Sequence, residues 1–414
     1  MRSADASGSE LAPFPRDFHA LWLGQSVSFV GSAVTRVALP LTAVLVLDAS
    51  AAEMGWLTAA QHLPMAIFGL VAGVWVDRMR RRPILVAADL LRGLLLATVP
   101  VAYALGGLSL AQLLVVAFGT GSLYVVAAVA DRAYLPTLLD KAQLVRGNSR
   151  IWFSMSVAQT AGPGLAGLLV GWLTAPFAIA VDAVSFGAAA ALLLSIRDRE
   201  ARPPHRGAHV VADIRDGIEF VRRHPLLRPL VIGGAIHNIC STMIVAVYFV
   251  YLPRDLLVGP ELLGGILLTS GLGALIGSSL SPRVTRGIGI GPTLVVTQLF
   301  TGVSRLLIPL AAGPLWAVVA VLVASEVLLG AMRPMFNIAQ ISLRQAIIPA
   351  DAMGRVNATI GFVLWGLTPL GALAGGYLGE AIGLRLTLAI AGAGVLLATG
   401  WLALSELPTQ RHLD

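Results

Sequence analysis

The chain has 414 residues, of which 57% are apolar and only 12% are charged. A soluble protein of this length does not need so much apolar surface, so the composition excludes a soluble globular domain and predicts an all-α integral membrane protein. The formal net charge of +7 does not indicate a nucleic-acid partner, because the arginines lie in short loops between apolar runs.

Apolar runs follow one another from residue 19 to residue 404. A transmembrane helix needs about 20 predominantly apolar residues, and alternating apolar runs and short polar loops predict twelve such helices. They are expected over residues 19–47, 54–76, 84–104, 109–130, 150–172, 177–195, 229–252, 261–281, 292–312, 315–338, 356–379 and 384–404.

The basic residues of the loops predict the orientation of these helices. Lys and Arg collect in alternate loops, above all at residues 78–82, 132–150 and 197–228. Loops rich in Lys and Arg stay in the cytoplasm, and the opposite loops contribute only Arg254 and Arg385. We therefore expect both termini in the cytoplasm and the chain in the bacterial inner (plasma) membrane.

The longest polar segment divides the chain into two similar halves. We predict a six-helix half over residues 1–196, a cytoplasmic linker over residues 197–228 and a second six-helix half over residues 229–414. Arg146-Gly-Asn148 and Arg355-Val-Asn357 precede corresponding helices of the two halves, which indicates an internal repeat. Within the linker, apolar residues at helical spacing after Asp213 predict a short helix at the membrane surface.

The loop between the second and third predicted helices carries a recognisable pattern, Gly-x-x-x-Asp-Arg-x-x-Arg-Arg. Its residues are Gly73, Asp77, Arg78, Arg81 and Arg82. The pattern resembles the signature loop of the major facilitator superfamily, although Arg80 stands where that family usually has glycine. The resemblance implies two six-helix halves and makes these residues candidates for a conformational switch, whereas a simpler interpretation is that any cytoplasmic loop is basic.

The fifth predicted helix contains Gly162-Pro163-Gly164-Leu-Ala-Gly167. This run resembles the Gly-Pro motif of drug:proton antiporters, which implies a bend of that helix at Gly162, Pro163 and Gly167. Over its whole length the chain resembles the branch that holds macrolide-efflux proteins and the enterobactin exporter. One feature of that branch is missing, because the fourth predicted helix has no arginine in its middle.

Pairs of small residues four apart occur in the second, fifth, eighth and eleventh predicted helices. Examples are Gly69 with Gly73, Gly273 with Gly277, and Gly371 with Gly375. Such pairs let helix backbones approach closely in lipid. The resemblance implies that these helices meet between the two halves; the alternative is that glycine is simply common in membrane helices.

Few ionisable residues lie within the predicted helices, and each needs a partner, water or a function. They are Arg36, Asp89, Arg92, Asp182, Arg305 and Glu326. Asp89 and Arg92 share a helical face and are expected to pair with each other or with the signature loop. Asp182 is expected to have a structural partner, with a proton-binding role as the alternative.

Glu326 is the carboxylate that the sequence singles out. Counting residues places it within about one turn of the depth of Arg305. Two interpretations remain open, a protonatable group that couples proton entry to substrate release and an ion pair that neutralises Arg305. His237 and Asn238 could line a polar cavity near them, although a lone histidine in a span more often forms hydrogen bonds in the core.

These observations together predict a secondary transporter that exports an amphipathic small molecule by proton antiport. Its expected partners are a small-molecule substrate, protons and the lipid bilayer, with no nucleic acid, no cofactor and no metal, and the chain is expected to act as a monomer. An uptake or facilitated carrier remains an alternative. A membrane enzyme or sensor is a more distant one, because the outer loops are too short to hold a catalytic site.

Overall fold

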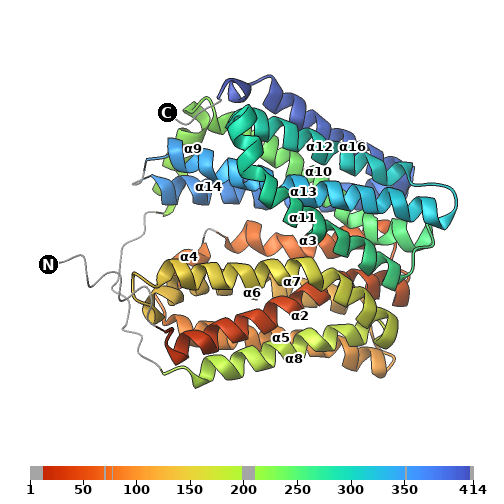
Figure 1. Ribbon diagram of the computed structural model, residues 1–414. Helices are drawn as coiled ribbons and strands as arrows, with labels where there is room; N and C mark the ends of the chain where they lie inside the picture. Colours follow the sequence, from red (N-terminus) through yellow and green to blue (C-terminus); the bar gives the residue numbers. More distant parts are fainter. Residues whose placement is uncertain (1–12, 70, 77, 198–209, 350–351, 411–414) are drawn as a thin grey trace. The chain divides into compact units, whose positions relative to one another are not determined.

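The structure is a computed structural model that describes residues 13–69, 71–76, 78–197, 210–349 and 352–410. Every regular element in these ranges is a helix, as Figure 1 shows. The prediction of an all-α chain is therefore confirmed. Asp77 of the predicted switch lies outside the described residues, and so do His205 and His209 of the linker.

The first part of the chain forms long helices joined by short connections. They are α2 (Arg16–Val46), α3 (Ala51–Phe68), α4 (Val71–Val76), α5 (Arg81–Ala104), α6 (Leu110–Leu138), α7 (Leu144–Leu173) and α8 (Ala175–Ser195). The predicted second span therefore runs over two helices, α3 and α4. The helix of the predicted fifth span, α7, is continuous through Pro163.

The second part of the chain is built in the same way, preceded by a short helix. The elements are α9 (Val210–Arg223), α10 (Leu227–Arg254), α11 (Pro260–Ile288), α12 (Ile290–Leu310), α13 (Leu315–Ile347), α14 (Met353–Gly366), α15 (Thr368–Ile382), α16 (Leu384–Ala403) and the 3-10 turn η1 (Leu407–Thr409). The predicted eleventh span is divided at Leu367, just before Pro369. Proline disfavours helical geometry in the preceding residue and lacks an N–H, so a helix boundary here is expected.

The helices group into two compact units. Unit 1 comprises Met1–Thr42 and Ile67–Ala208, and unit 2 comprises Ala43–Ala66 and His209–Asp414. Most of α3 thus belongs to unit 2. It packs there against α15, because a Cβ on Gly376 would lie 2.7 Å from the carbonyl oxygen of Ala51 and 2.8 Å from the Cα of Gly55.

Ten helical stretches of the described residues are long and apolar enough to cross a membrane. Two predicted spans are not among them. The second span is divided between α3 and α4, and the fifth carries Gln159, Thr160 and several glycines that lower its hydropathy. The membrane character of the chain is therefore confirmed at the level of a polytopic helical protein.

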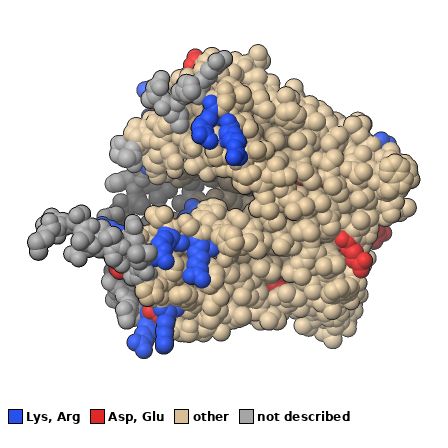
Figure 2. Space-filling view, in the orientation of Figure 1, with Lys and Arg blue, Asp and Glu red and all other residues tan. Residues whose placement is uncertain are grey.

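Large apolar side chains cover the outside of the helices as well as their interior. Leu94 is 67% exposed, Val184 is 72% exposed and Trp316 is 75% exposed. Figure 2 shows broad areas of surface without Lys, Arg, Asp or Glu. Since exposed apolar surface on this scale is unfavourable in water, it is the surface that the bilayer covers.

Glycines bring helix backbones together, and one meeting that the family resemblance implied, that of the second and eleventh spans, is seen between α3 and α15. Glycines of the eighth and eleventh spans also contact other helices. A Cβ on Gly277 would overlap the carbonyl oxygen of Ala331, and one on Gly371 would overlap that of Ile239. Both contacts lie inside unit 2, between α11 and α13 and between α15 and α10. In contrast, a Cβ on Gly73 would meet no atom within 4 Å.

The predicted linker helix is present as α9, and it packs on α14. Arg355 Nη1 lies 3.5 Å from Asp216 Oδ2, and Val221 joins Val356 and Ile360 in one apolar cluster. A Cβ on Gly217 would overlap the Thr359 hydroxyl, so only glycine allows this approach.

The last turn of α9 is stabilised by its own charges. Glu219 forms ion pairs with Arg222 and Arg223, at 2.8 Å and 2.5 Å. The hydrogen bond from Arg222 and the charges of both arginines lower the pKa of the Glu219 carboxyl. Arginines at this end of the helix also interact favourably with its dipole.

Candidate functional site

Buried charged side chains form one cluster in each unit. The Glu326 cluster of unit 2 consists of Tyr248, Arg305 and Glu326, contributed by α10, α12 and α13. The Arg92 cluster of unit 1 consists of Asp89, Arg92, Asp131 and Asp182, contributed by α5, α6 and α8. Charges in a membrane interior are costly and mark candidate functional sites, so each cluster is described in turn.

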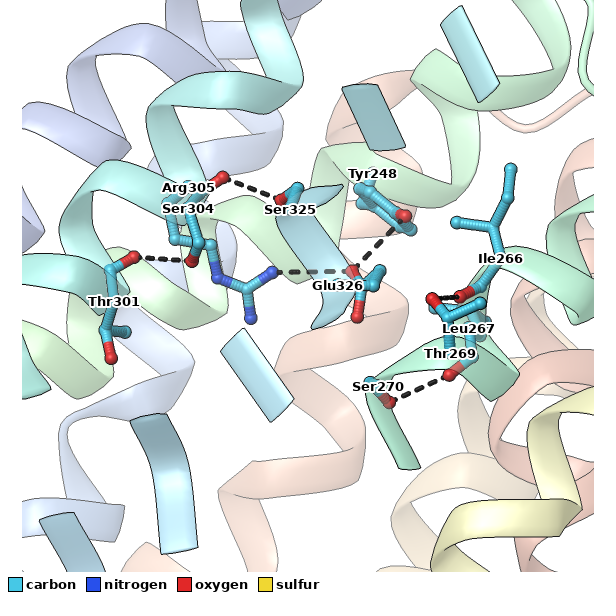
Figure 3. A network of polar contacts seen from close by, with 10 residues as sticks. All are labelled: Tyr248, Ile266, Leu267, Thr269, Ser270, Thr301, Ser304, Arg305, Ser325 and Glu326. Atoms are coloured by element: carbon cyan, nitrogen blue, oxygen red, sulfur yellow. Dashed lines mark hydrogen bonds and ion pairs between the residues drawn. The ribbon is translucent and has the colours of Figure 1, made fainter. Parts of the chain in front are cut away.

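In the Glu326 cluster the carboxylate has two polar neighbours. Arg305 Nη1 lies 3.9 Å from Glu326 Oε1, and the Tyr248 hydroxyl donates to the same oxygen at 3.5 Å (Figure 3). Glu326 is only 4% exposed. The expectation that Arg305 and Glu326 lie at the same depth is confirmed, and the structure adds Tyr248 as the third member.

Close helix packing explains why Glu326 is buried. Ser325 Oγ donates to the carbonyl oxygen of Ser304 at 2.7 Å, which joins α13 to α12 (Figure 3). One turn along α13, a Cβ on Gly330 would overlap the carbonyl oxygen of Ser270 on α11. These contacts on two sides hold α13 in a fixed position, so the carboxylate faces Arg305 rather than lipid.

The guanidinium group of Arg305 has a hydrogen-bond donor that its described neighbours do not use. Its Nε is buried and has no hydrogen-bond partner in the described residues. Arg333, on α13 as well, adds a second positive charge near Glu326, and its side chain is exposed. The described part of unit 2 thus places two guanidinium groups near one buried carboxyl group.

His237 and Asn238 of α10 take part in hydrogen bonds within unit 2. Gln298 Nε2 lies 2.9 Å from His237 Nδ1, and Ser241 Oγ lies 3.3 Å from His237 Nε2. Asn238 Nδ2 donates to the carbonyl oxygen of Leu364 at 2.8 Å. Both side chains are therefore engaged with other helices, which agrees with the core role that was the simpler expectation for the histidine.

In unit 1, Asp182 has the structural partners that were expected. Ser185 Oγ donates to its Oδ1 at 3.1 Å and Ser32 Oγ at 3.5 Å. The residue is 1% exposed. A Cβ on Gly31 would lie within overlap distance of both Asp182 and Ser185, so a glycine on α2 is what allows α8 to approach.

Asp89 and Arg92 interact electrostatically but form no direct ion pair in the described residues, and the alternative pairing with the signature loop stays a prediction. The guanidinium group of Arg92 lies over the ring of Phe186, 3.9 Å from its centroid, and 5.8 Å from that of Tyr124. No ion pair of Arg92 within 4.0 Å occurs among the described residues. The aromatic face of α8 holds the cation, a stable arrangement for arginine away from water, and the three carboxyl groups interact with it from a greater distance.

Asp131 is a member of this cluster that the sequence analysis missed. Gln25 Nε2 of α2 donates to Asp131 Oδ1 at 2.9 Å. The predicted fourth span ended at residue 130, so Asp131 and Arg132 looked like the start of a loop. Helix α6 continues to Leu138, and this continuation places Asp131 inside the helix bundle of unit 1.

The candidate switch residues fall into three groups. Arg82 donates to the carbonyl oxygens of Leu193 and Leu194 at 2.9 Å and 2.7 Å, so the start of α5 holds the end of α8. The backbone N–H of Arg78 donates to the carbonyl oxygen of Trp75 in the turn after α4, and Arg81 is the first residue of α5. The Arg81 side chain has further interactions. A Cβ on Gly73 would meet no atom within 4 Å, and Asp77 lies outside the described residues.

Two further predictions concern α2 and α7. Arg36 was expected as a buried charge of the first span, but the residue is exposed. In α7, Gly162 and Gly167 are buried, and a Cβ on Gly162 would overlap the side chain of Ala33. This part of α7 therefore serves close packing against α2.

The described residues contain no group of three His, Cys, Asp or Glu side chains arranged to hold a metal ion. The two clusters can instead bind or release protons and can attract a charged group of a substrate.

Comparison with known proteins places the whole chain in one group. Residues 8–414 match the family model described as transmembrane secretion effector. The multidrug efflux pump Tap of Mycolicibacterium fortuitum is 28% identical over 401 residues, which are 93% of this chain and 94% of that protein. Macrolide efflux protein A of Streptococcus pyogenes is 24% identical over 249 residues, which are 58% of this chain and 57% of that protein.

The fold has counterparts among solved structures. The crystal structure of the nucleoside transporter NupG superposes with a TM-score of 0.75 over 94% of this chain and 98% of that chain, at 12% identity. At this identity the likeness concerns the fold alone. The chain therefore shares the helical fold of this membrane transporter.

Proposed function

Because the chain belongs to the transmembrane secretion effector family of the major facilitator superfamily, we propose that it exports amphipathic small molecules, drugs and antibiotics among them, from the bacterial cell. It is a multi-pass membrane transporter and not an enzyme. The observation that carries the proposal is the match to a multidrug efflux pump over nearly the full length of both chains.

The finer architecture is part of the same proposal. Twelve transmembrane helices are arranged as six in residues 1–196 and six in residues 229–414, with residues 197–228 as a cytoplasmic linker and both termini in the cytoplasm. The basic loops support this orientation. The protein acts as a monomer and has no nucleic-acid partner.

The energy for export comes from the proton gradient. Buried carboxyl groups in both units support this mechanism, since a carboxyl group in a membrane interior can exchange protons without a nucleotide or a second domain. Residues Gly73, Asp77, Arg78, Arg81 and Arg82 act as the conformational switch of alternating access. Arg305, Glu326, His237 and Asn238 line or support the transport path in unit 2.

Transport measurements in everted membrane vesicles test the function directly. Vesicles that contain the protein should accumulate ethidium and radiolabelled erythromycin when the interior is acidified, at least several-fold above vesicles without it. A protonophore should abolish the accumulation. Net loss of both probes from preloaded everted vesicles would identify an uptake carrier. Accumulation that the protonophore does not reduce would exclude proton coupling.

Orientation is tested with single cysteines in a background in which Cys240 is replaced by serine. Gly107 and Gly287 both have open space around the Cβ position, so a cysteine fits at either site. We expect Gly107→Cys to react with an impermeant maleimide in intact cells and Gly287→Cys only after permeabilisation. Labelling in the opposite order would reverse the orientation and the direction of transport.

A further inference from the structure

Among the described residues, the Arg92 cluster contains more acidic groups than basic ones. Asp89 and Arg92 of α5, Asp131 of α6 and Asp182 of α8 interact electrostatically, so one guanidinium group faces three carboxyl groups. Helix α2 contributes the neutral side chains of Gln25 and Ser32, and α4, which also packs on α6, contributes no titratable side chain in its described residues.

Three ionised carboxylates around a single cation repel one another in a medium of low dielectric constant. The other side chains of α6 near the cluster do not relieve this repulsion, because Tyr124 has no basic group and the side chain of Arg132 is exposed. The cluster therefore binds additional positive charge, and protons are the smallest available form of it.

The three carboxyl groups differ in how accessible they are to a proton. Asp182 is 1% exposed and is closed in by two serine hydroxyls. Asp89 has no hydrogen-bond partner among the described residues that would hold a proton in a defined position. Asp131 is partly accessible and has one neutral partner, Gln25.

A glutamine side chain can serve a carboxyl group in both protonation states. Its amide nitrogen donates to the ionised carboxylate, which is the arrangement seen between Gln25 and Asp131 at 2.9 Å. Its amide oxygen can accept from the protonated form after the amide turns over. Gln25 Oε1 is buried and has no partner in the described residues, so turning the amide breaks no hydrogen bond at that oxygen. A cationic partner, such as Arg305 beside Glu326, instead favours the ionised form alone.

We propose that Asp131 is the carboxyl group that takes up and releases the coupling proton, with Gln25 as its hydrogen-bond partner in both states. This inference rests on the proposed proton-driven export. Arg92, held over Phe186, acts as a fixed countercharge that stabilises the cluster when Asp131 is ionised. On the export cycle the proton arrives from the outer side and leaves Asp131 for the cytoplasm.

The test compares Asp131→Asn with wild type in proteoliposomes, with radiolabelled erythromycin as the probe. Three quantities are measured, which are exchange of the probe without a gradient, uphill accumulation driven by a pH gradient, and protons released when the probe is added to the detergent-solubilised protein in weak buffer. We expect exchange within twofold of wild type, uphill accumulation reduced at least tenfold, and no proton release.

Two matched substitutions serve as comparisons. Asp140→Asn changes an exposed aspartate just after the same helix. Its probe exchange, uphill accumulation and proton release should equal those of wild type. Asp89→Asn makes the same isosteric change inside the cluster. If Asp89→Asn uncouples transport and Asp131→Asn does not, the assignment to Asp131 is wrong.

A second variant keeps the proposal testable if Asp131→Asn folds poorly. Gln25→Met removes the donor to the ionised carboxylate at nearly constant volume. The pH at which proton release is half-maximal should then rise by about 0.5–1 unit, because loss of that hydrogen bond disfavours the ionised form. An unchanged midpoint contradicts the role of Gln25 and Asp131.

The same measurements separate this inference from the proposed function. Wild-type protein that exchanges erythromycin but neither responds to a pH gradient nor releases protons overturns proton coupling itself, and this inference with it. Coupled wild-type protein with an equally coupled Asp131→Asn variant overturns the inference alone.

Discussion

Glu326→Gln should lower the yield of folded protein severely, and addition of Arg305→Gln should restore most of it. The single substitution leaves Arg305 as an uncompensated cation, and removal of one partner from a buried ion pair costs about 3–5 kcal/mol. In the part of the chain that the structure describes, the buried Nε of Arg305 already lacks a hydrogen-bond partner (Figure 3). Yield is measured by fluorescence-detected size-exclusion chromatography of detergent extracts.

Transport by the double variant then distinguishes the two interpretations of Glu326. If the residue only neutralises Arg305, the Glu326→Gln/Arg305→Gln protein should accumulate erythromycin with the proton gradient at half the wild-type rate or better. Tyr248→Phe is a useful companion, because it removes only the 3.5 Å hydrogen bond and should change yield little. A folded Glu326→Gln protein that exchanges substrate but has lost coupling would instead identify Glu326 as a proton carrier.

Gly277→Leu should prevent unit 2 from folding. A Cβ at this position overlaps the carbonyl oxygen of Ala331, a backbone atom of α13 that cannot rotate away. Insertion of side-chain atoms into a packed core costs about 1–3 kcal/mol, and more where the neighbour is backbone. We expect the variant to be nearly absent from size-exclusion profiles and to be degraded in cells.

Gly265→Leu is the matched control on the same helix. Its Cβ would meet no atom within 4 Å, and the residue is exposed, so a leucine there adds only apolar surface to the outside of α11. Its yield and melting temperature should equal those of wild type within a few degrees. Equal yields of the two leucine variants would show that α11 and α13 do not pack as closely as described.

The sequence alone identified the class of protein and the membrane character of its helices. Apolar runs of sufficient length predict transmembrane helices because the bilayer has no water to satisfy the backbone, and this requirement is local. The depth of a residue in a span follows from simple counting as well. Residue counting placed Arg305 and Glu326 at the same level, and the structure finds them 3.9 Å apart.

Helix ends were less predictable, and one functional candidate was lost for that reason. Polar residues end an apolar run in sequence, but a helix continues where its polar side chains find partners in other helices. Asp131 follows the predicted end of a span, yet α6 continues past it to Leu138, and Gln25 of α2 donates a hydrogen bond to its carboxylate. That partner is 106 residues distant in the chain, so only tertiary structure reveals it.

The partners of charges and glycines were also decided by tertiary structure. Spacing along α5 suggested that Asp89 pairs with Arg92, whereas the arginine lies over Phe186 of α8. Gly73 and Gly277 both belong to small-residue pairs of the sequence, yet a Cβ on Gly277 would overlap the backbone of α13 whereas one on Gly73 would meet no atom within 4 Å. The sequence by itself determined which segments enter the membrane, because that depends on the hydropathy of each segment alone. Only the tertiary structure decided which side chains meet, because a contact depends on the rotation and spacing of two helices at once.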